Sequence, residues 1–139
     1  ELGEGIKQTQ LLMERLNNSK TPPAIPIKLC LDVDHGDRGS NNADDTNPYE
    51  WIRLFGKQSP TVDLKQVTKN LFGHKPFTPE YNKIGLIKPD ELIKAFEESG
   101  AEETTLFLEL SFRERFPYDN NVVKDLKASV DYWRSYVTI

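Results

Sequence analysis

Hydrophobic residues along this chain follow two spacings, one typical of helices and one typical of strands. Segments 5–17, 48–55, 89–99 and 122–137 carry apolar residues near helical spacing, whereas segments 25–33, 61–67 and 104–110 are short apolar runs. The predicted order is helix, strand, helix, strand, helix, strand, helix. Such alternation predicts an α/β protein whose parallel strands are joined by right-handed crossover helices.

The segments between these elements indicate where the chemistry lies. Asn47 followed by Pro48 predicts a capped helix start, and Gly56 and Gly100 predict helix ends. Segments 34–47, 68–88 and 111–119 follow the strands and are polar, so we expect loops there. In (β/α)₈ barrels the loops after the strands carry the active site, and a whole barrel takes roughly 250 residues. Three strands predict the C-terminal part of a (β/α)₈ TIM barrel, with 1–139 as the C-terminal portion of one domain whose earlier strands precede Glu1.

Composition narrows the classes of partner. The chain has 139 residues, a net charge of −4 and 37% hydrophobic residues, so no general attraction to nucleic acid is expected. The one cysteine, Cys30, cannot form an internal disulfide, and its place in an apolar strand predicts a buried, inert thiol in a reducing compartment. No apolar run approaches the roughly 20 residues that span a bilayer. We therefore expect a soluble, cytoplasmic protein with no membrane or nucleic-acid partner.

Two carboxylates interrupt the predicted strands. Glu109 lies within Leu106-Phe107-Leu108-Glu109-Leu110, and Asp32 follows the apolar run that starts at Ile27. Burying an unpaired carboxylate costs several kcal/mol, so such residues usually serve a metal, a cation or catalysis. With Asp63 of the middle strand they would converge on one ion, for which oxygen ligands favour Mn²⁺, Mg²⁺ or Co²⁺. The alternatives are that Asp32 caps a turn and that Asp63 forms a structural ion pair with Lys65, on the same strand face.

Other polar side chains suit a bound sugar or phosphate. His35 follows Asp32 by three residues and would reach the barrel mouth, or else is simply solvated. Gln66 at a strand end would hydrogen-bond a sugar hydroxyl. The remaining candidates are cations in the loops above the expected active face, which suit a phosphate and are otherwise solvated loop charges: His74-Lys75 and Arg113-Glu114-Arg115.

These residues lie in motifs that resemble the sugar-phosphate isomerase/epimerase family with a xylose-isomerase-like barrel, in particular its tetrulose-phosphate (erythrulose phosphate) isomerases. The resemblance spans nearly the whole chain. Its matching stretches are Leu29-Cys30-Leu31-Asp32-Val33-Asp34-His35-Gly36-Asp37, Asn47-Pro48-Tyr49-Glu50-Trp51-Ile52-Arg53, Leu64-Lys65-Gln66, Gly73-His74-Lys75-Pro76-Phe77-Thr78-Pro79-Glu80-Tyr81-Asn82, Ser99-Gly100-Ala101-Glu102-Glu103 and Leu108-Glu109-Leu110-Ser111-Phe112-Arg113-Glu114-Arg115.

The resemblance implies a divalent metal held by carboxylates on the fifth, sixth and eighth barrel strands and a histidine on the seventh. Asp32 corresponds to the sixth-strand ligand, Glu109 to the eighth-strand ligand, and His35 to a histidine that contacts substrate. Two departures follow. The fifth-strand glutamate would lie before Glu1, and Asp63 stands where the seventh-strand histidine is expected.

We therefore expect a metal-dependent isomerase or epimerase of a small, phosphorylated sugar that works through an enediolate. Glu109 would move the proton and His35 would orient a hydroxyl, while Lys75, Arg113 or Arg115 would hold phosphate. Two other classes stay open. One is the zinc endonucleases that cut abasic DNA, which are disfavoured by the net negative charge and by a total of only two histidines in the sequence. The other is a non-catalytic sugar-binding barrel. The segment alone is expected to be inactive, with open sheet edges covered by the rest of the chain or by another copy in a homo-oligomer.

Overall fold

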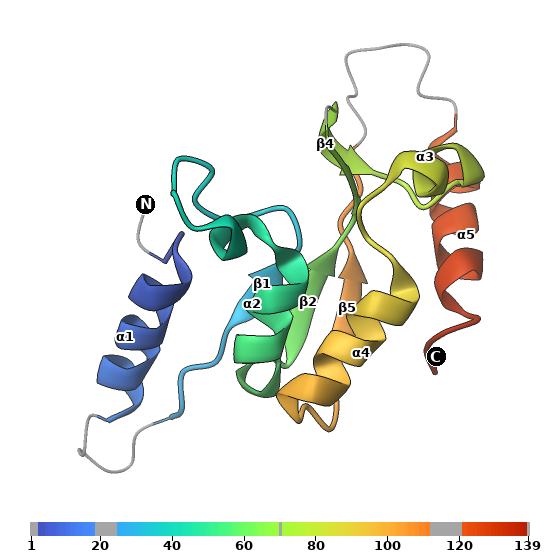
Figure 1. The fold of residues 1–139 in the computed structure, drawn as a ribbon. Coiled ribbons are helices and arrows are strands. Elements are labelled where there is room, and N and C mark those ends of the chain that lie inside the picture. Colours follow the sequence, from blue (N-terminus) through green and yellow to red (C-terminus); the bar gives the residue numbers. More distant parts are fainter. Residues whose placement is uncertain (1–2, 19–24, 70, 112–120, 139) are drawn as a thin grey trace.

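A three-stranded parallel sheet organises the molecule (Figure 1). The computed structural model describes residues 3–18, 25–69, 71–111 and 121–138. The strands β1 (Cys30–Asp32), β2 (Thr61–Leu64) and β5 (Thr105–Leu108) lie in that order, and both neighbouring pairs are parallel. Helices α2 (Pro48–Phe55) and α4 (Pro89–Ser99) connect them. The predicted alternation is confirmed, and three parallel strands alternating with helices fit part of a (β/α)₈ barrel.

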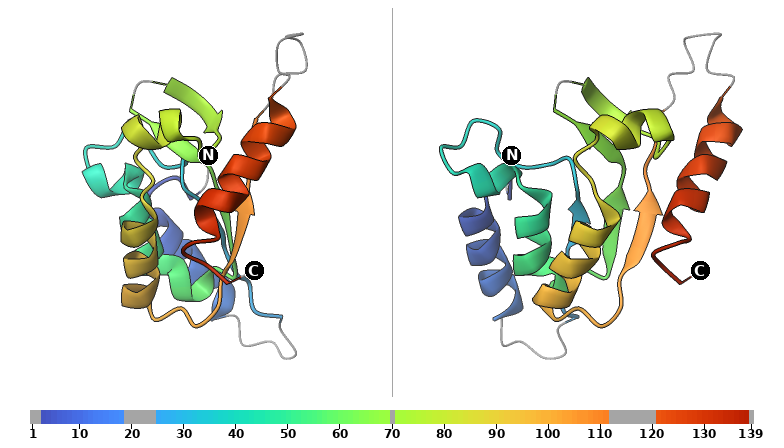
Figure 2. Two further views of the ribbon diagram at one scale, coloured as in Figure 1. Left: turned by 90° about the vertical axis from the view of Figure 1, so that its right-hand side faces the viewer. Right: turned by 45° about the vertical axis from the view of Figure 1, so that its right-hand side comes forward.

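The two faces of this sheet differ in what covers them. In Figure 2, α2 and α4 lie on one face, and no described helix lies over the other. Strand residues on the covered face are buried with residues of the two helices in one core: Leu31, Val33, Val62, Leu64, Ile52, Phe55, Leu92 and Ala95. Alternate strand residues point the other way, and Phe107 there is 52% exposed. The uncovered face is therefore the one on which polar groups can meet a ligand.

Local signals in the sequence set the helix ends as predicted. Asn47 precedes α2 and its side-chain Oδ1 accepts a hydrogen bond from the Tyr49 N–H at 3.1 Å. Gly100 ends α4 in the left-handed conformation with φ of 70°, which glycine adopts without steric cost. These two caps fix where each crossover helix starts or stops, and so where the following strand enters the sheet.

The region after β2 differs from its prediction. The expected strand 61–67 divides at Lys65 into β2 and β3 (Gln66–Thr68), and the expected loop 68–88 contains β4 (Leu71–Lys75) and helix α3 (Pro79–Ile84). Strands β3 and β4 form an antiparallel pair with a register shift. The apolar pattern did not reveal this hairpin because both strands are short and neither carries a sustained apolar run or alternation. The first expected strand, 25–33, is also shorter, since only Cys30–Asp32 pairs in the sheet.

Helices α1 and α5 flank the sheet (Figure 1). Helix α1 (Ile6–Asn17) is tied to the segment after β1, because Asp45 Oδ1 accepts a 2.8 Å hydrogen bond from the Ile6 N–H. Hydrogen bonds from Ser40 and from this N–H lower the pKa of Asp45. Helix α5 (Val122–Trp133) ends before the predicted residue 137, and its Trp133 packs edge-on against Phe77.

Tyr132 and Trp133 of α5 both pack against Phe77, and the Trp51 ring lies at a tilt to that of Phe55. Two short 3₁₀ turns complete the described structure, η1 (Ala43–Thr46) and η2 (Gly56–Gln58). Within the described ranges, no helix combines the length and the apolar character needed to cross a membrane.

Candidate active site

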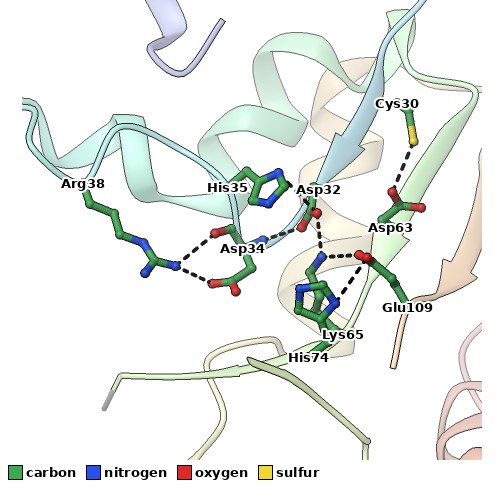
Figure 3. A network of polar contacts seen from close by, with 9 residues as sticks. All are labelled: Cys30, Asp32, Asp34, His35, Arg38, Asp63, Lys65, His74 and Glu109. Atoms are coloured by element: carbon green, nitrogen blue, oxygen red, sulfur yellow. Dashed lines mark hydrogen bonds and ion pairs between the residues drawn. The ribbon is translucent and has the colours of Figure 1, made fainter. Parts of the chain in front are cut away.

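A lysine between two carboxylates forms the centre of the uncovered sheet face (Figure 3). The Lys65 ammonium donates to Asp32 Oδ2 at 2.6 Å and also to Glu109 Oε2. The three residues come from the carboxyl ends of three different strands. The predicted meeting of Asp32 and Glu109 is therefore present, with an ammonium group between them.

Strand register explains why these groups meet. Asp32 lies beside Asp63 in the β1–β2 pairing, and the Glu109 N–H donates to the Leu64 carbonyl at 2.9 Å, just after the β2–β5 pairing. Lys65 is two residues beyond Asp63, so alternation returns its side chain to the same face. Carboxyl ends of parallel strands share one edge of the sheet, and this brings residues 33 and 44 positions apart into contact.

Burial makes the lysine unusual. The Lys65 side chain is 0% exposed, that of Asp32 is 12% exposed and that of Glu109 is 44% exposed. Burial alone would lower the pKa of the Lys65 ammonium, but its hydrogen bonds to Asp32 and Glu109 outweigh burial and raise that pKa above its ordinary value. Lys65 is thus a buried, charged group that binds Glu109, while the Glu109 side chain remains partly exposed on the uncovered face of the sheet.

Two histidines flank the carboxylates. His74 of β4 lies with Nδ1 3.2 Å from Glu109 Oε1, and its side chain is 29% exposed. His35, in the segment after β1, lies with Nδ1 3.4 Å from Asp32 Oδ2 and is 77% exposed. Asp32 Oδ1 also accepts a 2.8 Å hydrogen bond from the Asp34 N–H, so this aspartate does organise the turn after β1. Asp32 therefore lies beside His35 and Glu109 beside His74, and both carboxylates also contact Lys65.

Asp63 is the third acid on this face. One oxygen each from Asp32, Asp63 and Glu109 lies within 4.8 Å of the others, the kind of oxygen set that divalent cations prefer. Lys65 makes its ion pairs across strands with Asp32 and Glu109, and not the alternative pair with Asp63 on its own strand. Asp63 Oδ2 instead lies 3.6 Å from the Cys30 sulfur (Figure 3). Cys30 is exposed, so the expectation of a buried thiol was wrong: its strand position alternates onto the uncovered face.

Gln66 does not fit the expected role of a sugar ligand. Its side chain is fully buried, and its amide oxygen accepts from the N–H groups of Val67 and Ile87. The amide nitrogen donates to the Ile87 carbonyl and to Asn82 Oδ1, both at 3.0 Å. An amide has two donor hydrogens and two acceptor lone pairs, so all four are in use. Gln66 fastens β3 to the segment before α4.

The expected phosphate ligands are only partly described. Lys75, at the end of β4, has its ammonium 5.7 Å from the centre of the Tyr81 ring, a cation–π contact. Arg113 and Arg115 lie outside the described residues. Lys75 shares the hairpin that carries His74, so it stands one residue from a group that contacts Glu109.

The sequence did not reveal two of the central contacts. The alternation left Lys65 open between a functional role and a structural ion pair with Asp63, and it gave no partner on another strand. His74 is expected from the sequence only as a loop cation that suits phosphate or is solvated. The alternation of Asp63 and Lys65 was the available signal for Lys65. For His74 the signal would have been the β3–β4 hairpin, which turns this histidine back toward β5. The His74 side chain there lies beside Glu109, and the His74 carbonyl accepts a 3.1 Å hydrogen bond from the Ser111 N–H.

Comparison with known proteins identifies one relative. The chain is 42% identical over 137 residues, 99% of its length, to the D-erythrulose 1-phosphate 3-epimerase of Brucella abortus (strain 2308). It spans 44% of the length of that relative. No protein-family model matches the chain. The similarity agrees with the resemblance drawn from the motifs: over nearly its whole length this chain is similar to an erythrulose-phosphate epimerase.

Proposed function

We propose that the full-length protein containing this chain epimerises a short ketose phosphate at the carbon next to its carbonyl. The observation that carries the proposal is the pair of carboxylates, Asp32 and Glu109, brought together on the uncovered sheet face of a chain 42% identical to a 3-epimerase. Because the chain covers 44% of that relative, the remaining barrel strands and the rest of the site are part of the proposal.

The chemistry needs only a proton transfer and a stabilised oxyanion. In a four-carbon 2-ketose, the hydrogen on carbon 3 lies next to the carbonyl and is acidic for that reason. A base removes this proton, the C–H electron pair forms a carbon–carbon double bond, and the carbonyl oxygen becomes the enediolate oxygen. Return of a proton to the opposite face of carbon 3 inverts its configuration. No oxidant or co-reactant is consumed.

Glu109 is the group we assign to the proton transfer. It is the more exposed of the two carboxylates that hold Lys65, and a positioned carboxylate typically contributes about 10²–10⁴-fold to such a step. Inversion requires a second acid or base on the opposite side of the substrate carbon. We assign this role to the fifth-strand glutamate expected ahead of Glu1.

Substrate contacts are proposed for the polar groups around the site. His35, exposed and next to Asp32, would orient a substrate hydroxyl. Lys75, together with Arg113 and Arg115, would hold the phosphate, since a cation suits its charge. These assignments follow the family resemblance, and Gln66 is left out because its amide is saturated within the fold.

A divalent metal, Mn²⁺, Mg²⁺ or Co²⁺, is the cation that the resemblance implies. Such a metal would polarise the substrate carbonyl when bound, and the oxygens of Asp32, Asp63 and Glu109 suit it in kind. The position of Lys65 does not suit such an ion. Its ammonium already lies between Asp32 and Glu109, and because like charges repel, it competes with a divalent ion for the same oxygens.

The direct test follows hydrogen exchange. Full-length protein is incubated with D-erythrulose 1-phosphate in D₂O, and the carbon-3 proton signal is followed by NMR together with formation of the epimer. The proposal expects exchange and epimer formation with this substrate, and slower reaction with unphosphorylated erythrulose. A protein that neither exchanges this proton nor forms the epimer is not an epimerase of this class.

A further inference from the structure

Lys65 lies beside the cluster of three acids whose oxygens could hold a metal ion. The oxygens of Asp32, Asp63 and Glu109 cluster within 4.8 Å, and the Lys65 ammonium contacts two of these residues. Figure 3 shows it entering between Asp32 and Glu109. Its side chain is 0% exposed, so it is packed between its neighbours and does not lie on the surface of the site.

We propose that the Lys65 ammonium is the resident cation of this site and takes the place of a divalent metal in gathering Asp32 and Glu109. The inference deepens the proposed function and rests on it for its kinetic consequences. Its structural content, that the three acids bind no divalent metal while Lys65 is present, can be tested on its own.

Every oxygen atom of both carboxylates already has at least one partner. Asp32 uses Oδ1 for the Asp34 N–H, while its Oδ2 lies 2.6 Å from Lys65 and 3.4 Å from His35 Nδ1. Glu109 holds Lys65 on Oε2 and has His74 3.2 Å from Oε1. A metal that displaced these contacts would leave a buried ammonium beside it without its partners. Breaking one partner from a buried ion pair is strongly destabilising.

Lys65 acts through the carboxylates and not on the substrate. It is fully covered, whereas Glu109 is 44% exposed on the open side. By holding one Glu109 oxygen, the ammonium fixes the direction of the carboxylate that we assign to the proton transfer. Small displacements of a catalytic group reduce rates strongly, so a positioning lysine affects turnover more than substrate binding.

The charge alternation in the sequence fits this assignment. A sheet face that gathers three acids needs a positive charge near them, because like charges at short range repel. The chain supplies that charge two residues beyond Asp63, on the same face as all three acids. Substituting Lys65 by a small neutral residue would leave three carboxylates and space between them, which is the arrangement that binds Mn²⁺.

The deciding experiment measures Mn²⁺ binding by full-length protein, using calorimetry and the EPR signal of free Mn²⁺. We expect no site of this kind in the natural protein or in Lys65→Arg, which keeps the charge. Lys65→Ser is expected to bind one Mn²⁺ at least about 100-fold more tightly than the natural protein does, a difference of about 2.7 kcal/mol in binding free energy. Adding Asp63→Asn to Lys65→Ser should weaken that binding. Natural protein that binds one Mn²⁺ and loses it in Asp32→Asn would overturn the proposal.

Kinetics separate this inference from the proposed function. Epimerisation should survive EDTA, and Lys65→Met should lower kcat with little change in KM. Activity that disappears with EDTA and returns with Mn²⁺ overturns the inference while the epimerase assignment stands. If the full-length protein has no epimerase activity, the proposed function is wrong, and the Mn²⁺ titration still decides whether Lys65 excludes the metal. Should Lys65→Ser fail to fold by circular dichroism, the titration of the natural protein decides it.

Discussion

Two buried polar residues, adjacent in the chain, have opposite surroundings. Lys65 and Gln66 are both 0% exposed. Lys65 faces Asp32 and Glu109, whereas Gln66 turns the other way and meets backbone groups of Val67 and Ile87. A neutral amide with every hydrogen bond made holds the fold together, while a buried ion pair is often no more stabilising than apolar residues of the same size. Equal burial therefore accompanies a structural role for Gln66 and the positioning role that we propose for Lys65.

The same division runs across the sheet. Residues one step apart in a strand point to opposite faces, so Leu31 and Leu64 build the core with α2 and α4 while Asp32 and Lys65 form the site. Substitutions on the two faces should consequently fail in different ways. Those on the site face should reduce activity in a stable protein, and those on the helix face should reduce stability first.

The largest effect is expected at Glu109. Glu109→Gln keeps the size of the side chain but cannot accept a proton from carbon 3, so epimerisation should fall by about 10³-fold. The measurement is the rate of carbon-3 exchange in D₂O with full-length protein. Glu102→Gln, exposed at the opposite end of β5, is the matched control and should retain full activity. A Glu109→Gln protein with more than a tenth of normal activity would remove Glu109 from the proton transfer.

Gln66→Leu should break the other side of the comparison. It leaves the N–H groups of Val67 and Ile87 without their acceptor in a buried place, and each buried orphan costs about 1–3 kcal/mol. We expect the free energy of unfolding to drop by about 3 kcal/mol, measured by denaturant titration. Gly85→Ala should act in the same direction, because its Cβ would come 2.1 Å from Gln66 Cδ. A loss below about 1 kcal/mol in both variants would contradict the structural role.

How far the sequence could predict this site depends on the kind of contact. Asp32 and Glu109 were found because each interrupts an apolar strand, and parallel strands bring such residues to one edge. The partners of Lys65 were not found, because they lie 33 and 44 residues away and are chosen by the strand register. Hydrophobic alternation gives the face of a residue but not its neighbours across the sheet.

The errors also have a common cause. The pattern predicts a ligand role for Gln66 because the expected strand runs on to Val67, whereas the chain leaves the parallel sheet at Lys65 and enters the β3–β4 pair. The pattern predicts a core position for Cys30 because its neighbours are apolar, although it alternates onto the site face. In both cases an apolar run implies one environment for residues whose side chains point in different directions.

Phe107 tests whether the uncovered face is an interior in the full-length protein. It lies on that face, opposite Asp63 in the sheet, and is 52% exposed in this chain. Closure of a barrel by earlier strands would bury it, so Phe107→Ala should then destabilise full-length protein by about 2 kcal/mol. Val123→Ala on α5, where the side chain is 79% exposed, is the control and should change stability little. Equal, small effects of both substitutions would mean that the face stays open.

The smallest effect is expected at His74, and it sharpens the contrast within the site itself. His74 approaches the Glu109 oxygen that Lys65 does not hold, so His74→Phe removes one of the two contacts that orient this carboxylate. Since Lys65 still holds the other oxygen, kcat should fall only about tenfold, equivalent to about 1.4 kcal/mol, with KM unchanged. His35→Phe is the matched variant, because His35 lies beside Asp32, is 77% exposed and is proposed to contact substrate. It should raise KM more than it lowers kcat. If His74→Phe changed KM alone, His74 would be a substrate ligand, and Lys65 would be left as the residue that positions Glu109.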